Sequence, residues 1–245
     1  MNFQELDELK AKLNKMRPLN EAELNRLREQ FAIENTYNSN AIEGSTLTLR
    51  ETALVLQEGI TIGEKPLKEH LEAIGHRDAI DYIQTIATPN APLTERDILD
   101  IHSLILMNDR QNKGVYRRIS VTIMGAVHTP PHPMEVPIQM KQQLSDYEEM
   151  KKQKHIIEAI AEFHLRFEGI HPFIDGNGRT GRLIMNLELM KAGFLPINIK
   201  YTDKRGYFDC FDHYYANGHT PQTLIDLIVK YEQEEIEKRL NLLNE

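Results

Sequence analysis

The stretch His171-Pro-Phe-Ile-Asp-Gly-Asn-Gly-Arg-Thr-Gly-Arg182 concentrates more reactive and charged side chains than any other part of this 245-residue chain. Apolar residues recur at steps of three and four before it, from Ile156 to Phe167, and again after it, from Leu183 to Met190. Such spacing is typical of amphipathic helices with one buried face. The stretch is therefore expected to form a loop that leads into the N-terminus of a second helix.

The glycine-rich part of this stretch predicts an anion-binding loop. A helix N-terminus exposes unpaired N–H groups and the positive end of the helix dipole, and Gly176 and Gly178 let the backbone approach an anion closely. Arg179 and Arg182 lie three residues apart and share a face of the first turn, where positive side chains are unfavourable against the dipole. A phosphate between the two arginines would remove this conflict.

Two further side chains suit phosphate chemistry. Asp175 is a short carboxylate beside the loop, and Mg²⁺ commonly bridges phosphate oxygens while it binds one or two carboxylates and several waters. His171 is a candidate general base, because an imidazole with a pKa of about 6.5 accepts a hydroxyl proton at neutral pH. Simpler roles stay open for each residue alone: a helix cap for Asp175 or Asn177, a structural loop histidine for His171 and a solvated side chain for Arg182.

The whole stretch resembles the signature of the Fic (filamentation-induced-by-cAMP) family, His-x-Phe-x-Asp/Glu-Gly-Asn-Gly-Arg-x-x-Arg, at every specified position. Family members with the full motif transfer AMP from ATP to a hydroxyl side chain of a target protein. The resemblance implies His171 as the general base and Asp175 as the Mg²⁺ ligand. The motif residues that it assigns to the nucleotide are Asp175, Gly176, Asn177, Gly178, Arg179, Thr180, Gly181 and Arg182.

The resemblance thus implies a protein adenylyltransferase that modifies Ser, Thr or Tyr and releases pyrophosphate, with self-AMPylation left open. The Doc-like branch, which phosphorylates its target, usually departs from the motif at the positions of Gly176 and Arg182, so their presence favours AMP transfer. Two alternatives remain open for the same site: a de-AMPylating hydrolase and a non-catalytic nucleotide-sensing adaptor. The intact His171 favours an enzyme over an adaptor.

A second motif, Ser39-x-x-x-Glu43-Gly44, lies at the expected C-terminus of an N-terminal helix. Ser39 and Glu43 are four residues apart and point the same way, one turn from a glycine stop. Taken alone, Glu43 is typical of a solvated carboxylate at a helix end. The motif resembles the Ser/Thr-x-x-x-Glu-Gly/Asn inhibitory motif of Fic proteins whose inhibitory helix precedes the core. That resemblance implies that Glu43 pairs with Arg182 and forces ATP into an unproductive pose.

The remaining pattern predicts an all-α fold with one β-hairpin and an N-terminal helical segment, and the resemblance implies that this is the Fic type of fold with the hairpin as a flap over the site. Residues 115–124 alternate in polarity and are rich in β-branched side chains, and a glycine turn follows them. We interpret them as a hairpin over the site, whose open edge holds the target protein by strand addition. Residues 1–90 are expected to form the N-terminal helical region that carries the inhibitory motif, and residues 91–245 the catalytic core.

The resemblance also assigns residues outside the motif to the nucleotide. It implies that Gly125, Ala126, Val127 and His128 of the flap frame the nucleotide. It further places an aromatic pair beside the adenine, on a helix that begins near residue 203. The aromatic residues that match this helix are Tyr207 and Phe208, with Tyr215 as a third candidate, although aromatic residues at helical spacing are otherwise typical of a core.

Composition excludes several other classes of protein. A net charge of −8 and a pI near 5.7 argue against general affinity for nucleic acid, which needs a basic surface. The single cysteine, Cys210, excludes an internal disulfide framework and fits a reducing compartment. The N-terminus lacks an apolar signal core, and no apolar run approaches a membrane span. We therefore expect a cytoplasmic monomer or homodimer that binds ATP, Mg²⁺ and a target protein, and neither nucleic acid nor membrane.

Overall fold

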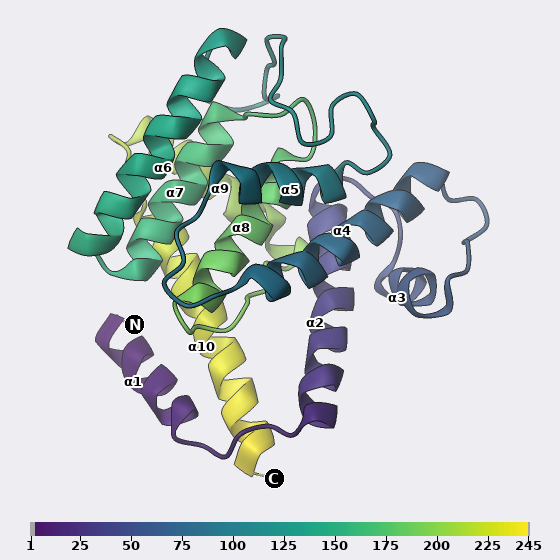
Figure 1. Ribbon diagram of the computed structural model, residues 1–245, viewed down its shortest axis with the longest axis vertical. Helices are drawn as coiled ribbons and strands as arrows, with labels where there is room; N and C mark the ends of the chain where they lie inside the picture. Colours follow the sequence, from purple (N-terminus) through teal and green to yellow (C-terminus); the bar gives the residue numbers. More distant parts are fainter. Residues whose placement is uncertain (1–2, 245) are drawn as a thin grey trace.

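The computed structural model describes residues 3–244, and over this range the chain is all-helical and contains no β-strand (Figure 1). Within the same range, no helix combines the length and the apolar character that crossing a membrane requires. The elements in chain order are α1 (Phe3–Asn14), α2 (Glu21–Ile42), α3 (Leu49–Glu58), α4 (Leu67–Ile86), α5 (Glu95–Ile105), the 3₁₀ helix η1 (Pro133–Glu135), α6 (Val136–Gln153), α7 (Ile156–Ile170), α8 (Asn177–Lys191), the 3₁₀ helix η2 (Tyr201–Asp203), α9 (Lys204–Ala216) and α10 (Gln222–Asn244).

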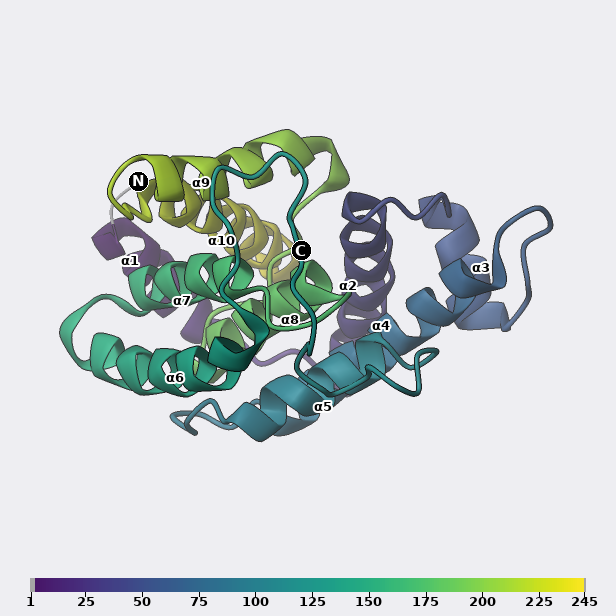
Figure 2. The same ribbon diagram turned by 90° about the horizontal axis from the view of Figure 1, so that it is seen from above.

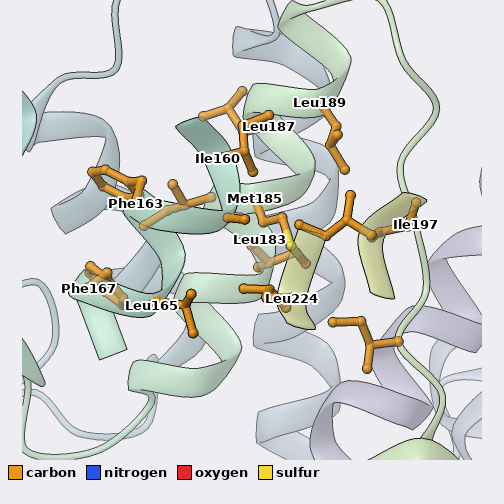
Figure 3. Packing of buried hydrophobic residues seen from close by; sticks show 14 of the residues in the cluster. Ile160, Phe163, Leu165, Phe167, Leu183, Met185, Leu187, Leu189, Ile197 and Leu224 are labelled. Atoms are coloured by element: carbon orange, nitrogen blue, oxygen red, sulfur yellow. The ribbon is translucent and has the colours of Figure 1, made fainter. Parts of the chain in front are cut away.

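The helices α7 and α8 form the centre of the core. Helix α7 packs against α6, α8 and α10, and α8 also packs against α2, α4 and α5 (Figures 1 and 2). Burial of one large aliphatic or aromatic side chain stabilises the fold by about 1.5–3 kcal/mol. The contacts of α7 and α8 with the helices around them therefore hold the start of α8 firmly. Figure 3 shows the buried side chains Ile160, Phe163, Leu165 and Phe167 of α7 and Leu183, Met185, Leu187 and Leu189 of α8, with Ile197 and Leu224 beside them.

The C-terminal half of α2 is buried although many of its side chains are polar. This helix packs against α3, α4 and α8. The Thr36 hydroxyl lies 3.1 Å from His76 Nδ1 of α4, and the Tyr201 N–H donates to Asn38 Oδ1 at 2.8 Å. Because buried polar groups need hydrogen-bond partners, these contacts fix both the position and the rotation of α2. The helix that ends beside Glu43 is therefore an integral part of the core.

The predicted β-hairpin is wrong, because residues 115–132 form an irregular loop, called the flap loop below. An alternating pattern gives a strand only when a neighbouring strand takes up the backbone hydrogen bonds. Here the Arg117 N–H donates instead to the Pro172 carbonyl at 2.9 Å. Pro130 and Pro131 at the end of the loop have no N–H to contribute to a ladder. The loop still crosses from the α5 end of the molecule to α9 (Figure 2).

A glycine permits the close approach of α4 to the C-terminal end of α5. A Cβ atom on Gly75 would collide with the Leu104 carbonyl oxygen and lie 3.1 Å from Met107 Sδ. We expect Gly75→Ala to lower the free energy of unfolding by about 1–3 kcal/mol, because overpacking forces the two segments apart. Urea denaturation measures this change.

The matched control is Gly206→Ala in α9, where an added Cβ meets nothing within 4 Å. Alanine favours the helix over glycine by about 0.5–1 kcal/mol, so this variant is expected to gain stability. A Gly75→Ala protein as stable as the Gly206→Ala protein would contradict the close approach.

Candidate active site

The chain turns sharply at His171, between α7 and α8. This residue has a φ of 49° and caps α7, its N–H donating to the Phe167 carbonyl at 3.0 Å. The His171 Nδ1 lies 3.3 Å from the Glu168 carbonyl oxygen, which only accepts, so the ring proton is on Nδ1 and Nε2 is left as an acceptor. Burial lowers the pKa of His171 below its ordinary value. The imidazole is therefore a neutral base at neutral pH.

Two side chains hold the loop between α7 and α8 in one shape. Asn177 Oδ1 accepts from the Phe173 N–H at 2.8 Å, and its Nδ2 donates to the Phe173 carbonyl at 2.9 Å. His102 Nδ1 accepts from the Gly114 N–H at 2.9 Å, so the proton on Nε2 points to the Asp175 carbonyl 3.0 Å away. Burial lowers the pKa of His102 to about 4, which keeps this imidazole neutral. The Asn177 amide thus stabilises the loop from within.

The first turn of α8 faces a carboxylate. Gly176 has a φ of 78°, a conformation that glycine adopts without strain. Gly178 lies so close to Glu43 that an added Cβ would collide with the carboxylate oxygen Oε1. That same oxygen accepts a hydrogen bond from Arg182 Nη2 at 2.8 Å. An acidic side chain thus lies at the helix N-terminus where the sequence predicts an anion site.

The Arg182 guanidinium is buried and held by α2 on one side and α9 on the other. Its Nε donates to Ser39 Oγ at 3.0 Å and its Nη2 to the Ser39 carbonyl at 2.9 Å. Its Cζ lies 5.6 Å from the centre of the Tyr207 ring. Burial acts to lower the pKa of Arg182, but the Glu43 carboxylate outweighs it and the pKa is raised. The structure therefore brings Ser39 and Glu43 onto Arg182, with Gly44 at a φ of 103° directly after them.

Arg179 takes different partners. Its Nη1 lies 2.9 Å from Glu72 Oε1 of α4, and its Nη2 lies 3.2 Å from Asp175 Oδ1. Lys68 Nζ of α4 lies 3.7 Å from the other Asp175 oxygen. The two arginines that the sequence places around one anion are thus held by separate carboxylates. Removing one partner of a buried pair such as Arg179 and Glu72 costs about 3–5 kcal/mol, so this arrangement is firmly fixed.

A cavity of about 310 Å³ opens beside His171. It is lined by His171, Glu168, Gly178, Arg182 and Glu43, by Ile123, Met124, Gly125, Ala126 and His128 of the flap loop, and by Tyr207, Phe208, Phe211 and Asp212 of α9. The imidazole, the guanidinium and the N-terminus of α8 therefore share one space. Its walls are aromatic on the α9 side, which suits a flat ring, and charged at the α8 side.

Several predicted nucleotide residues do not line this cavity. Val127 is 61% exposed, and Thr180 is fully buried within α8. The Tyr215 ring stacks on His128 with ring centres 3.8 Å apart, and its hydroxyl donates to the Leu165 carbonyl at 3.2 Å. Tyr215 thus supports the flap loop. The other predicted residues outside the lining are Asp175, Gly176, Asn177, Arg179 and Gly181.

Sequence reasoning missed Glu168, which lines the cavity three residues before His171 on α7. Its carboxylate lies against Gly181, where a Cβ would collide with Oε1. Burial raises the pKa of Glu168 to about 8, and the nearby Glu43 carboxylate adds to the shift. Glu168 is therefore mainly a neutral acid at neutral pH. The only signal in the sequence is its spacing of three from His171 on a helix.

Sequence reasoning also missed Arg117, which ties the flap loop to the His171 turn. The buried guanidinium donates from Nε to the His171 carbonyl at 2.8 Å, from Nη1 to the Ile119 carbonyl at 3.0 Å and from Nη2 to the Pro131 carbonyl at 2.6 Å. Both ends of the loop are thus joined to the residue that carries the base. Arg117 falls within an alternating pattern, and nothing in the local sequence marks it as a clamp.

The fold is a helical core in which a turn at His171 leads into the glycine-rich N-terminus of α8, and these features together are those of a Fic-type protein. Residues 92–189 match the Fic/DOC family model, and the chain belongs to this family. It is 34% identical over 206 residues to protein adenylyltransferase Fic of Drosophila willistoni, covering 83% of this chain and 41% of that protein. It is also 34% identical over 208 residues to the protein of the same name from Nematostella vectensis, covering 83% of this chain and 48% of that one. The chain spans less than half the length of these curated relatives.

Solved structures show the same fold. A Fic domain containing signaling protein from Bacteroides thetaiotaomicron superposes with a TM-score of 0.87 at 29% identity, covering 100% of this chain and 97% of that one. Fic-1 from C. elegans superposes with a TM-score of 0.81 at 27% identity, covering 97% of this chain and 70% of that one. The likeness to the Bacteroides protein extends over the N-terminal helices as well as the residues that match the family model.

The Arg117 clamp predicts how the flap loop moves. A lysine at this position has one ammonium group, which cannot reach three carbonyl groups in the planar arrangement of a guanidinium. We expect Arg117→Lys to speed hydrogen exchange of the loop amides, because local opening becomes easier. Mass spectrometry of peptides that span residues 118–132 measures the exchange.

The matched control is Arg118→Lys, since Arg118 is exposed and next in the chain. Its exchange rates are expected to equal those of the wild-type protein. Equal exchange in both variants would show that Arg117 does not hold the loop.

Proposed function

We propose that this protein is a protein adenylyltransferase that transfers AMP from ATP to a Ser, Thr or Tyr hydroxyl of a target protein. The observation that carries the proposal is the cavity that His171, Arg182 and Gly178 line together at the N-terminus of α8. The name of the curated relatives supports it. In this proposal residues 91–245 supply the catalytic core and residues 1–90 carry the inhibitory carboxylate.

The nucleotide fits this cavity in one orientation. Its phosphates belong at the N-terminus of α8, because the helix dipole, the N–H groups and Arg182 attract an anion there. Its adenine belongs between the flap loop and α9, where Phe208 and Phe211 line the wall. Tyr207 is buried and its hydroxyl lies 2.7 Å from His164 Nε2, so it supports Arg182 as well as lining the wall.

Mg²⁺ fits beside these phosphates at Asp175. The Asp175 side chain is 48% exposed. Its Oδ1 accepts from the Gly176 N–H at 2.6 Å and lies 3.2 Å from Arg179 Nη2, and Lys68 Nζ lies 3.7 Å from Oδ2, so a hydrated cation would replace these positive side chains at the carboxylate. In the part of the chain that the structure describes, no group of three or more His, Cys, Asp or Glu side chains gathers into a metal site. The cation would therefore be held by Asp175 together with phosphate oxygens and waters, and it would neutralise charge on the phosphates.

The chemical step follows from the His171 tautomer. The target hydroxyl oxygen attacks the α-phosphorus of ATP, its proton passes to His171 Nε2, and the bond from the α-phosphorus to the bridging oxygen breaks to release pyrophosphate. The Glu168 carbonyl holds Nδ1–H and so orients the ring for this transfer. General base catalysis of this kind contributes a factor of roughly 10²–10⁴ to the rate. Arg182 and the α8 amides stabilise the charge on the phosphates.

The target protein approaches over the flap loop in this proposal. The exposed apolar side chains of the loop include Ile119, Met124, which is 96% exposed, and Val127. Exposed apolar side chains beside a catalytic cavity suit contact with another protein. The contact is made through side chains, since the loop offers no strand edge for main-chain pairing.

Glu43 keeps the enzyme inhibited in this proposal. Its carboxylate lies against Gly178 and on Arg182, in the space that the terminal phosphate of ATP needs. Two anions in that space repel each other, so ATP binds there only in a displaced pose while Glu43 remains. The side chain of Glu43 is 36% exposed, which leaves it free to swing away from the helix end.

The first test of this function compares two variants. We expect His171→Ala to abolish AMP transfer, and Glu43→Gly to raise it at least tenfold because the phosphate position becomes free. Incubation with labelled ATP and Mg²⁺, followed by intact mass spectrometry of the protein and of lysate proteins, detects the addition of AMP.

Equal incorporation by the wild-type and Glu43→Gly proteins would remove the regulatory part of the proposal. If no variant adds AMP to itself or to any lysate protein, the result would favour the non-catalytic nucleotide-sensing adaptor. Loss of AMP from a premodified protein without any addition would identify a hydrolase.

The buried imidazole predicts the acid limb of the pH profile. Because burial lowers the pKa of His171, the ring stays unprotonated below its ordinary pKa of about 6.5, and activity is lost only as the pH falls through the lowered value. For the Glu43→Gly protein we expect an acid midpoint of kcat/KM below 6.5. Rates measured from about pH 5 to about pH 8 with ATP saturated by Mg²⁺ give this midpoint. A midpoint at or above 6.5 would contradict a buried neutral base.

A further inference from the structure

A carboxylate on α4 holds the turn that follows the inhibitory residue. Glu69 Oε2 accepts from the Thr46 N–H at 2.8 Å, from Ser45 Oγ at 3.1 Å and from the Leu47 N–H at 3.2 Å. The Thr46 hydroxyl also lies 3.2 Å from Glu69 Oε1. Hydrogen bonds to a charged acceptor are about twice as strong as neutral ones, so this group of contacts holds residues 45–47 firmly. We call Glu69 with residues 45–47 the turn clamp.

Two other contacts fix the same turn. Lys65 Nζ donates to the Thr46 carbonyl at 2.6 Å, so the peptide is held from both its N–H and its carbonyl side. The Leu47 side chain is buried in a small apolar cluster with Val55 of α3 and Ala73 of α4. The turn is therefore attached to α4 by hydrogen bonds and by packing, and its position follows that of α4.

Glu69 is ionised at neutral pH. Burial acts to raise the pKa of Glu69, but the hydrogen bonds from Thr46, Ser45 and Leu47 outweigh it, and the pKa is lowered. The clamp is thus present above the ordinary pKa of a glutamate and is lost only as the pH falls through a lower value. The charge also lies in the first turn of α4, where the helix dipole favours it.

Glu43 lies directly before this turn. It is the residue after the last of α2, and its N–H reaches the Asn40 carbonyl at 3.1 Å. Gly44 alone separates it from the clamped residues, and the last turn of a helix frays unless the chain beyond it is held. A frayed end would carry the Glu43 carboxylate off Arg182.

We propose that Glu69 is a positioning residue for inhibition, which keeps the Glu43 carboxylate on Arg182 by fixing the turn after α2. This inference rests on the proposed inhibition by Glu43. It assigns to α4 a second role in the site, because the same helix also holds Arg179 through Glu72. Glu69 does not line the cavity, and its hydrogen bonds go to Ser45, Thr46 and Leu47, which do not line it either.

The test is Glu69→Gln, which keeps the shape of the side chain but places an NH₂ group where donors now point. Loss of one charge-assisted hydrogen bond changes the equilibrium between the held and the released turn by about tenfold. Because only the released state frees Arg182 from Glu43, AMP transfer is expected to rise about tenfold above wild type. Thr46→Ala removes one donor to the clamp and is expected to raise activity less. It provides the same test if the Glu69→Gln protein fails to fold.

The double variant separates positioning from general loosening of the fold. In the Glu43→Gly protein the inhibitory carboxylate is already absent, so adding Glu69→Gln is expected to give no further increase. Wild-type activity of the Glu69→Gln protein would overturn the inference. So would an equal fold-increase when Glu69→Gln is added to the wild-type and to the Glu43→Gly protein.

The matched control is Asp97→Asn, since Asp97 also accepts a backbone hydrogen bond, from Thr94 at 2.9 Å, in the capping box of α5. It is expected to keep wild-type activity, whereas activation equal to that of Glu69→Gln would show that any loosening suffices. If Glu43→Gly itself gives no increase, the proposed inhibition fails. If Glu43→Gly raises activity and Glu69→Gln does not, the proposed inhibition stands and only the positioning role of Glu69 is contradicted.

Discussion

A buried guanidinium at the N-terminal turn of the central helix is the constraint on which this site depends. Arg182 is 3% exposed, and an unpaired charge at such a position costs several kcal/mol. The residue therefore requires an anion, and the position at the start of α8 attracts one in any case. Glu43 meets that requirement within the chain itself. In the proposed function, inhibition and phosphate binding both follow from the charge of Arg182, and each excludes the other.

This requirement explains why the N-terminal helices belong to the core. A carboxylate that competes with a phosphate has to be carried by an element whose position is fixed, and α2 is fixed by buried polar contacts such as that of Thr36 with His76. Helix α4 holds the other arginine, Arg179, through Glu72. The residues that match the family model begin after α4, yet the charges of the motif are balanced from α2 and α4. Removal of these helices would take Ser39 and Glu43 from Arg182 and Glu72 from Arg179, which would keep only Asp175 among these carboxylates.

The sequence predicted what depends on local pattern. The helical fold follows from periodic apolar residues, and the loop into α8 follows from its glycines. The pairing of Glu43 with Arg182 was reached through the family resemblance, whereas the two hydrogen bonds from Arg182 to Ser39 were not predicted. The prediction of a hairpin was wrong because the backbone of this segment bonds to a part of the chain distant in sequence. The Arg117 N–H, for example, donates to the Pro172 carbonyl. The pairing of Arg179 with Glu72 was missed for the same reason, since no local pattern records which helix lies beside another.

Glu168 is a second carboxyl group in the cavity, and its protonation state affects which anions can bind there. Two ionised carboxylates beside one guanidinium would leave a net negative charge where a triphosphate has to enter. Burial keeps Glu168 protonated at neutral pH, and the nearby Glu43 carboxylate reinforces this. If phosphates take the place of Glu43, as the proposed function requires, a negative charge remains beside Glu168 and favours retention of its proton. In the proposed function, the cavity therefore holds one anion at a time against Arg182, and the neutral acid beside it lets that anion be either the Glu43 carboxylate or a phosphate of the substrate.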